Sequence, residues 1–322
     1  MPRYPWGKTV RFGGRSLRAS GRQTGGRLRV ALTAFGFGAS AVRRRVARAR
    51  RAIIRDAVGL IARVYFDVSY GLLTGSVAGR RLLALPAAGD EPVHGYFTSQ
   101  DRDVLLADLD PAPGTRLLDL GCGVGGIAVD LHRRSGAEIL GVDVSWRAVS
   151  AATARARRAG VDSSVVFLVG DLTRPPRLGA ASAYAIDSLM FVPDLGLAIR
   201  GIGDVLGSGG RLVATLLVFG SGAEARLRRS IEAAGADVLR LEDVTRALAD
   251  RSRARADAAD AIRQDGTASL RGSLAARLVG AEEALIGTLV ADGRVGRWRF
   301  VVRFRPAPER DAAHSRPAAP VA

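Results

Sequence analysis

Apolar and polar positions follow two different rhythms through the middle of the chain. Short apolar runs, typical of buried strands, are separated by longer stretches in which apolar residues recur every three or four positions, as in helices. The apolar runs predict strands at residues 116–120, 138–145, 164–171 and 182–189, and a fifth within 207–219. The other stretches predict helices at residues 99–109, 125–134, 147–159 and 196–206. Strands and helices that alternate through short loops predict a parallel sheet with helices on both faces.

The C-terminal part continues this pattern less regularly. We expect a helix at residues 223–234, a sixth strand at 237–241 and a seventh at 297–304. The segment between the last two strands, residues 244–295, predicts a helical insertion. Its apolar stripe consists of Leu270, Leu274, Leu278, Ala281 and Leu285. This stripe fits packing onto the sheet and also a lid over an apolar substrate pocket, and the two do not exclude each other.

The N-terminal part shows a different composition. Residues 1–38 are rich in Gly, Arg and Ser without a sustained period, so we expect a disordered basic extension. Residues 39–95 predict a helical arm and a connection, and the main domain should span residues 96–305. The Pro- and Ala-rich tail, residues 306–322, is expected to be disordered. The apolar stripe of the arm consists of Val46, Ile53, Leu60 and Val64.

The positive charge of the chain is concentrated in this N-terminal part. The formal net charge is +17, and residues 1–64 hold sixteen of the 48 basic residues but one acid, Asp56. A basic arm can bind nucleic acid, lie on an anionic membrane or do neither. We expect no nucleic-acid partner, because the rest of the chain is nearly neutral and shows no RNA-binding module. Peripheral membrane contact through residues 39–64 stays open.

Cysteine and histidine counts limit the chemistry. The single cysteine, Cys122, excludes an intramolecular disulfide and a multi-cysteine metal site, and the three histidines are far apart in sequence. We therefore expect no metal. No apolar run approaches the roughly 20 residues that a membrane-spanning helix needs. We expect a cytoplasmic location, with membrane association through the arm as an alternative.

The stretch "LLDLGCGVGG", residues 117–126, carries the most informative motif. Gly121, Gly123 and Gly126 satisfy the dinucleotide pattern G-x-G-x-x-G, while Gly121, Gly123 and Gly125 satisfy a pattern with an acid, Asp119, two residues earlier. A carboxylate this close would repel a pyrophosphate and attract a ligand with an amino group and a cationic centre. The motif therefore favours a cationic ligand over a dinucleotide.

Acidic residues end the next two predicted strands. Asp143, followed by Val144, ends the second strand, where a carboxylate can accept hydrogen bonds from two ribose hydroxyls. Asp171, followed by Leu172, ends the third strand and can accept from an adenine amino group. An adenosine-containing ligand fits both positions.

Together these motifs resemble the class I S-adenosylmethionine-dependent methyltransferases, over residues 97–304. The resemblance implies a doubly wound α/β fold, with a mostly parallel, Rossmann-like sheet of seven strands, and S-adenosyl-L-methionine as cofactor. It also implies that Asp119 faces the amino group of the methionine part, that Asp143 holds the ribose and that Asp171 reads the adenine. The remaining implied cofactor-binding residues are Gly121, Cys122, Gly123, Val144, Leu172 and Tyr96.

A second resemblance is less specific. The segment "HGYFTSQDRDVLLADL" (residues 94–109), "EDVT" (242–245) and the final "RWRFVVRF" look like the branch that includes tocopherol-, sarcosine- and quinone-type methyltransferases. This resemblance implies a small-molecule acceptor, lipidic or a secondary metabolite, methylated on O, N or C. It also implies that Tyr96 and Phe97 cover the cofactor, although both also fit ordinary core positions.

Methyl transfer from a sulfonium depends mainly on positioning, because the donor is already activated. A neutral nitrogen acceptor needs no base, whereas a phenol or a carbon acid does. The candidate catalytic bases are Asp187, near the end of the fourth strand, and His94. Two alternatives stay open: a non-catalytic protein of the same fold that binds the cofactor, and an RNA methyltransferase that uses the basic arm.

Overall fold

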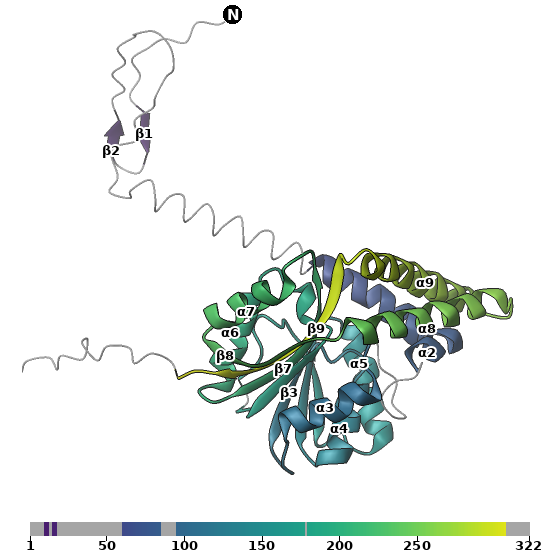
Figure 1. The fold of residues 1–322 in the computed structure, drawn as a ribbon, viewed down its shortest axis with the longest axis horizontal. Helices are drawn as coiled ribbons and strands as arrows, with labels where there is room; N and C mark the ends of the chain where they lie inside the picture. The colour runs from purple at the N-terminus through teal and green to yellow at the C-terminus, as the bar shows by residue number, and fades with distance from the viewer. Residues whose placement is uncertain (1–9, 13–14, 18–59, 85–94, 178, 307–322) are drawn as a thin grey trace, which may run out of the picture. The chain divides into compact units, whose positions relative to one another are not determined.

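The structure is a computed structural model that describes residues 10–12, 15–17, 60–84, 95–177 and 179–306 (Figure 1). The chain divides into two units, Met1–Ala49 and Arg50–Ala322. In the first unit, β1 (Val10–Phe12) pairs antiparallel with β2 (Arg15–Leu17). The expected disorder of residues 1–38 stays a prediction. The other predictions for residues 1–59 and for the tail after residue 306 lie outside the described residues.

A seven-stranded sheet forms the centre of the second unit, in the order β5-β4-β3-β6-β7-β9-β8. All neighbouring strands pair in parallel except β9, which is antiparallel to both β7 and β8. The strands are β3 (Arg116–Leu120), β4 (Glu138–Asp143), β5 (Val165–Val169), β6 (Ser182–Ile186), β7 (Arg211–Phe219), β8 (Ala236–Asp243) and β9 (Val295–Phe304). The predicted fold class, a doubly wound and mostly parallel sheet of seven strands, is confirmed.

Consecutive residues of β3 show why the sheet needs helices on both faces. Leu117 is buried in one hydrophobic core and Leu118 in another, because successive side chains of a strand point to opposite faces. The first core includes residues of α3 (Ser99–Leu109), α4 (Gly126–Ser135) and α5 (Trp146–Ala159). The second includes residues of α6 (Leu195–Leu206) and α7 (Ala223–Ala233). A short 3-10 helix, η1 (Leu189–Phe191), follows β6.

The strand order reverses its direction at β3. This strand pairs with β4 on one side and with β6 on the other, so the connections leaving β3 and β6 run to opposite halves of the sheet. In open α/β sheets, ligands bind in the crevice beyond the carboxyl ends of the strands at such a switch point. The loops after β3, β4 and β6 are therefore the place to look for a site.

Four helical segments form a further layer beside the sheet. Residues 60–74 are helical, followed by α2 (Val77–Leu83), and the predicted insertion consists of α8 (Thr245–Gln264) and α9 (Leu270–Ala291). Figure 1 shows α2, α8 and α9 gathered at one end of the sheet. Their shared core contains Leu73, Leu82, Ala259, Ala276 and Val279. This core joins the N-terminal helices to an insertion near the other end of the sequence.

The predicted packing of the leucine stripe in α9 is wrong. Leu270, Leu274 and Leu285 are 78%, 44% and 59% exposed. The buried face of α9 instead carries Gly272, Ala275, Ala276, Val279, Glu283 and Ile286. Small residues allow the neighbouring helices to approach closely. Because α9 is apolar on more than one side, its sequence period alone does not choose the packed face.

The stripe of the N-terminal arm is exposed where the structure describes it. Leu60 and Val64 are 62% and 55% exposed, whereas Tyr70 and Leu73 are buried. Val46 and Ile53 lie outside the described residues. Helix 60–74 therefore packs through its C-terminal half.

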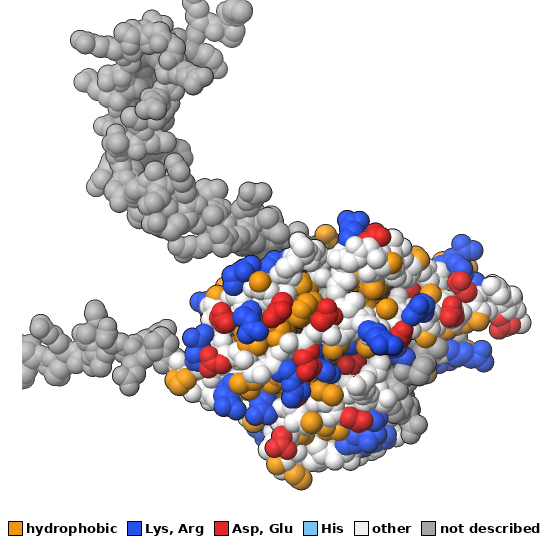
Figure 2. All heavy atoms as spheres, in the orientation of Figure 1, with side chains coloured by type: hydrophobic (Ala, Val, Ile, Leu, Met, Phe, Trp, Pro, Cys, Tyr) orange, Lys and Arg blue, Asp and Glu red, His pale blue; other side chains and the backbone are white. Residues whose placement is uncertain are grey.

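The surface of the described part carries mixed charges. Figure 2 shows Arg side chains interspersed with Asp and Glu side chains on the visible face of the second unit. This mixture agrees with the near-neutral composition of the chain after residue 64.

Candidate active site at the carboxyl end of the sheet

The glycine-rich loop between β3 and α4 is forced into its shape by close neighbours. Gly121 and Gly123 have φ angles of +86° and +51°, in the region that favours glycine. A Cβ on Gly121 would lie 2.3 Å from the Cβ of Ser188, and one on Gly123 would lie 2.8 Å from the Tyr70 hydroxyl. The loop therefore passes tightly between the turn after β6 and helix 60–74.

Asp143 holds this loop from the end of β4. Its Oδ2 accepts a hydrogen bond from the Gly123 backbone N–H and its Oδ1 one from the Ser145 N–H, both at 2.9 Å. Burial raises the pKa of Asp143, and the N–H donors of Ser145 and Gly123 oppose that shift. An ionised carboxylate can accept about four hydrogen bonds, so Asp143 retains capacity for ligand hydroxyls.

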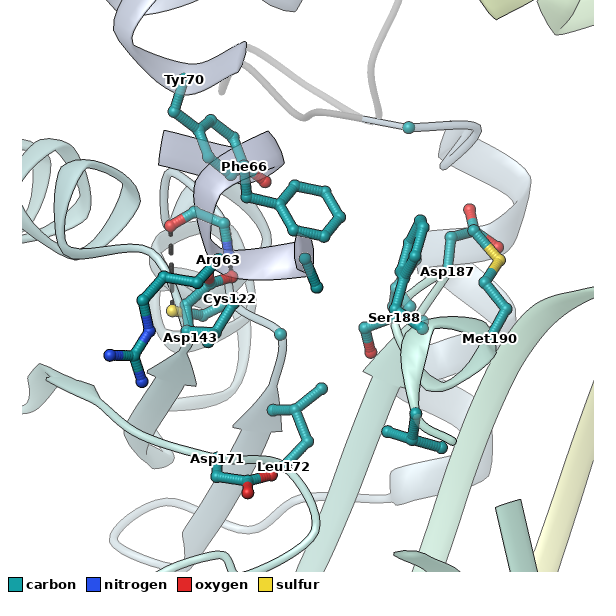
Figure 3. Close-up of a pocket in the computed structure, with 18 of the residues that line it drawn as sticks. Arg63, Phe66, Tyr70, Cys122, Asp143, Asp171, Leu172, Asp187, Ser188 and Met190 are labelled. Atoms are coloured by element: carbon teal, nitrogen blue, oxygen red, sulfur yellow. Dashed lines mark hydrogen bonds between the residues drawn. The ribbon is translucent and has the colours of Figure 1, made fainter. Parts of the chain in front are cut away.

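A cavity of about 400 Å³ opens beside the loop (Figure 3). Helix 60–74 forms one wall with Arg63, Phe66 and Tyr70, and Figure 3 shows Ser188, Asp187 and Met190 on the opposite side. Asp171 and Leu172, from the loop after β5, lie at the lower edge of the same view. The cavity thus occupies the switch point that the strand order indicates.

Most of the site residues expected from the sequence come together in this cavity. Its lining includes Gly121, Cys122, Gly123, Asp143, Val144, Asp171, Leu172, Tyr96 and Asp187. Burial raises the pKa of the Cys122 thiol well above its usual range, in keeping with a packing role. His94, the other expected base, lies outside the described residues.

Asp119 does not line the cavity. It is buried on β3, and burial raises its pKa to about 8, with the nearby Tyr184 hydroxyl lowering it and Asp143 raising it further. Neither Asp119 Oδ2 nor the Tyr184 hydroxyl makes a hydrogen bond of ordinary geometry with the described residues. The Asp119 side chain lies on the same face of β3 as that of Leu117, and its expected position facing the ligand amino group stays a prediction.

Asp187 is held by a buried arginine. Arg297 Nε donates to Asp187 Oδ1 at 2.9 Å and Arg297 Nη2 to Oδ2 at 3.0 Å, while Thr215 Oγ1 donates to Oδ1 at 2.9 Å. Arg297 Nη1 also binds Asp101, at 2.9 Å. Together with the Tyr96 backbone N–H, these donors fill the roughly four acceptor positions of the Asp187 carboxylate and leave none for a substrate proton. The geometry therefore argues against Asp187 as the base and favours a role in fixing the turn after β6.

The two aromatic residues expected to cover the cofactor, Tyr96 and Phe97, lie in different surroundings. Tyr96 lines the cavity, and its backbone N–H donates to Asp187 Oδ2 at 3.4 Å while its hydroxyl donates to Glu283 Oε2 at 3.3 Å. Phe97 is only 1% exposed and belongs to the core with α3 and α4. Tyr96 thus fits the covering role, and Phe97 is an ordinary core residue.

Sequence reasoning missed the wall supplied by helix 60–74 and η1. The Phe66 ring meets the Phe191 ring edge to face, with centroids 4.8 Å apart, and stacks with Tyr70 at 6.1 Å. Glu282 of α9 also lines the cavity. The cluster of aromatic residues in "YFDVSY", residues 65–70, was the available signal, but nothing local connects it to the distant glycine loop.

Two observations bear on other expectations. Among the residues that the structure describes, no three His, Cys, Asp or Glu side chains gather closely enough to hold a metal ion. No helix within the described ranges is long and apolar enough to cross a membrane.

Comparison with known families agrees with this geometry. Residues 111–253, which run from the loop before β3 into α8, match the family model described as a methyltransferase domain. This part of the chain is therefore similar to methyltransferase domains. The glycine loop, Asp143 and Asp171 all fall within the matched part of the chain.

Curated relatives of the methyltransferase domain include two bacterial enzymes. Methyltransferase GfsG of Streptomyces halstedii is 35% identical over 36% of this chain and 43% of its own length. The 27-O-demethylrifamycin SV methyltransferase of Amycolatopsis mediterranei is 34% identical over 38% of this chain and 50% of its own length. The chain thus spans half or less of these two relatives.

Solved structures share the fold of the methyltransferase domain. A phosphoethanolamine N-methyltransferase of Haemonchus contortus superposes with a TM-score of 0.58 over 73% of this chain and 58% of its own, at 18% identity. The [4+2]-cyclase SpnF superposes with a TM-score of 0.54 over 65% of this chain and 82% of its own, at 27% identity. Because one neighbour is named as a cyclase, the fold alone does not decide the reaction.

Proposed function

We propose that this chain is an S-adenosylmethionine-dependent methyltransferase that acts on a small apolar acceptor. The observation that carries the proposal is one cavity with two kinds of lining. The backbone of the glycine loop and the Asp143 carboxylate form the polar part of the lining, and η1 and helix 60–74 contribute apolar side chains.

The residues present fit the cofactor. Asp143 keeps lone pairs for ribose hydroxyls, the Gly121–Gly123 backbone is open to close approach, and Asp171 with Leu172 can meet a purine. Among the described lining residues, acidic side chains outnumber basic ones, since these residues include Arg63 and four carboxyl groups. This excess of negative charge suits a cationic ligand. When bound, S-adenosylmethionine supplies a methyl group on a positively charged sulfur.

Part of the cavity lining is apolar, and we assign the acceptor to this part. It includes Phe66, Met190, Phe191, Val192 and Pro193. The Phe66 and Phe191 rings meet edge to face in this part of the lining, which favours an apolar molecule. The names of the two bacterial relatives above and of the sterol C-methyltransferases that also match are consistent with a small-molecule acceptor.

The covering elements come from both ends of the chain. We assign α8 and α9, within residues 244–295, and helix 60–74 as the lid of a methyltransferase domain that otherwise spans residues 96–305. Two contacts support this assignment. Glu282 of α9 lines the cavity, and Phe66 of helix 60–74 reaches η1 on the opposite side.

Titration calorimetry with S-adenosylhomocysteine tests the proposal. We expect the wild-type chain to bind it and Asp143→Ala to bind it about 10- to 100-fold more weakly, because charge-assisted hydrogen bonds are worth about 1.5–3 kcal/mol. Asp204→Asn, an exposed carboxyl on α6, is the matched control and should leave the affinity unchanged. Tight binding of NAD without affinity for S-adenosylhomocysteine would overturn the proposal.

A further inference from the structure

Four carboxyl groups line the cavity among the described residues: Asp143, Asp171, Asp187 and Glu282. Asp143 is bound by two backbone N–H groups and Asp187 by Arg297, as described above. Asp171 Oδ1 accepts from the backbone N–H and the hydroxyl of Thr173, both at 2.8 Å, on an exposed loop. Within the described part of the chain, the fourth group, Glu282, has no structural role in the site comparable to those of the other three.

Glu282 lies beside a buried ion pair but is not one of its two members. Arg255 of α8 directs its Nε to Glu283 Oε1, and Arg255 and Glu283 are both 2% exposed. Glu282, the next residue on α9, turns to the cavity and interacts with the Tyr65 hydroxyl from helix 60–74. Its negative charge is therefore less well compensated than those of Asp187 and Glu283.

The charged and titratable groups around Glu282 come from every element packed on it. They are Tyr65 and Tyr70 of helix 60–74, Tyr96 before α3, Arg255 of α8 and Glu283 of α9. Burial raises the pKa of Glu282, Arg255 and the Tyr65 hydroxyl lower it, and Glu283 raises it. A carboxyl group shifted in this direction is better matched to accept a proton near neutral pH than an ordinary glutamate.

We propose that Glu282 is the catalytic base of the methyl transfer, and that the acceptor group is a hydroxyl on an apolar molecule. This inference rests on the proposed function. An amine in its neutral form would need no base, whereas a hydroxyl is a weak nucleophile until its proton is removed. The apolar lining favours binding of an apolar molecule. The Glu282 carboxylate favours reaction at a hydroxyl of that molecule, because it can accept the hydroxyl proton.

The step balances without another reactant. The hydroxyl oxygen forms the new O–CH₃ bond while the S–CH₃ bond of the sulfonium breaks, and the electron pair of that bond stays on sulfur. The hydroxyl proton moves to the Glu282 carboxylate, which becomes neutral. The charges of sulfonium and carboxylate both disappear, which favours the step because the neutral products need less solvation than the two ions.

Titration of Glu282 by NMR tests its environment without any turnover. In the full chain labelled with ¹³C at the glutamate carboxyl carbons, one signal should titrate above the ordinary value of about 4.3 and be missing in Glu282→Gln. Tyr65→Phe should move that titration higher, because it removes a donor that stabilises the anion. An ordinary titration of Glu282 would overturn the proposal.

Methyl transfer to matched probes tests the role itself. With S-adenosylmethionine, the hydroxyl probes are 2-naphthol and 1-dodecanol and the amine probe is 2-naphthylamine. The wild type should methylate a hydroxyl probe, with a rate that falls as the pH drops through the Glu282 titration. Glu282→Gln should lose about 100-fold or more of that rate and keep any methylation of the amine. Asp292→Asn, an exposed carboxyl just after α9, should behave as the wild type.

The outcomes separate this inference from the proposed function. Unchanged hydroxyl methylation in Glu282→Gln overturns the inference, and so does a wild type that binds S-adenosylhomocysteine but methylates no hydroxyl probe. Loss of S-adenosylhomocysteine binding in Glu282→Gln would assign Glu282 to the cofactor instead and also overturns it. A wild type that does not bind S-adenosylhomocysteine overturns the proposed function.

Discussion

Arg297 holds both carboxylate oxygens of Asp187, at 2.9 and 3.0 Å, although 110 residues of chain separate the two. Arg297 is fully buried in β9 and also binds Asp101 in the first turn of α3. Asp187 has a positive φ of 51°, an unusual backbone conformation for aspartate that this pairing helps to hold. One guanidinium thus fixes the turn after β6, the start of α3 and the last strand together.

Removing this arginine should be costly. Arg297→Met leaves Asp187 and Asp101 buried without their cation, so we expect a loss of about 3–5 kcal/mol in the free energy of unfolding. Urea denaturation followed by circular dichroism measures it. Arg303→Met, an exposed position on the same strand, is the control and should change stability by less than about 0.5 kcal/mol. Similar stabilities for the two variants would contradict the structural role of Arg297.

The close approach of Tyr70 to the glycine loop predicts coupling between two substitutions. Gly123→Ala should destabilise the chain for two reasons, because alanine is strained at a φ of +51° and its Cβ would lie 2.8 Å from the Tyr70 hydroxyl. Tyr70→Phe in the same chain should recover part of that loss by removing the hydroxyl. Thermal melts of the two single variants and the double variant measure the coupling, and strictly additive effects would show that the contact is absent.

Asp119 predicts a pH dependence of stability. Its pKa is raised from 3.8 to about 8 by burial, so the folded state binds this proton more tightly than the unfolded state. The associated stability is present below pH 4 and is lost as the pH rises towards 8. Asp119→Asn should remove this dependence. The stability of the variant relative to the wild type should therefore rise between pH 4 and pH 8. If the difference in melting temperature between the wild type and Asp119→Asn is the same at pH 5, 6.5 and 8, the raised pKa of Asp119 is ruled out.

Deletions of the N-terminal region should have graded effects. Removing residues 1–38 should leave S-adenosylhomocysteine affinity unchanged, because no described residue of that segment lines the cavity. Removing residues 1–74 should weaken binding and lower the melting temperature, because it deletes the cavity wall of Phe66 and Tyr70 and the buried Leu73. Calorimetry and thermal melts distinguish the two deletions. A loss of affinity with the shorter deletion would mean that the domain begins earlier than residue 39.

The sequence by itself determined the elements whose signals are local. Alternating strands and helices predicted the doubly wound sheet, and the glycine loop with the acids at positions 143 and 171 predicted where a nucleotide-like ligand would sit. These signals survive without tertiary contacts because strand burial, tight turns and strand-end positions depend on neighbouring residues. Asp119 of the same motif is buried on β3, and its role in binding the ligand stays a prediction.

The tertiary structure alone decided the rest of the site. Nothing in the sequence pairs Asp187 with Arg297, brings Phe66 to Phe191, or turns Glu282 to the cavity while Glu283 takes Arg255. Helix periodicity likewise failed to choose the packed face of α9, because this helix is apolar on more than one side. Partners that are distant in the sequence decide which helix face is buried and which acid pairs with the arginine. Only the folded packing brings these partners together.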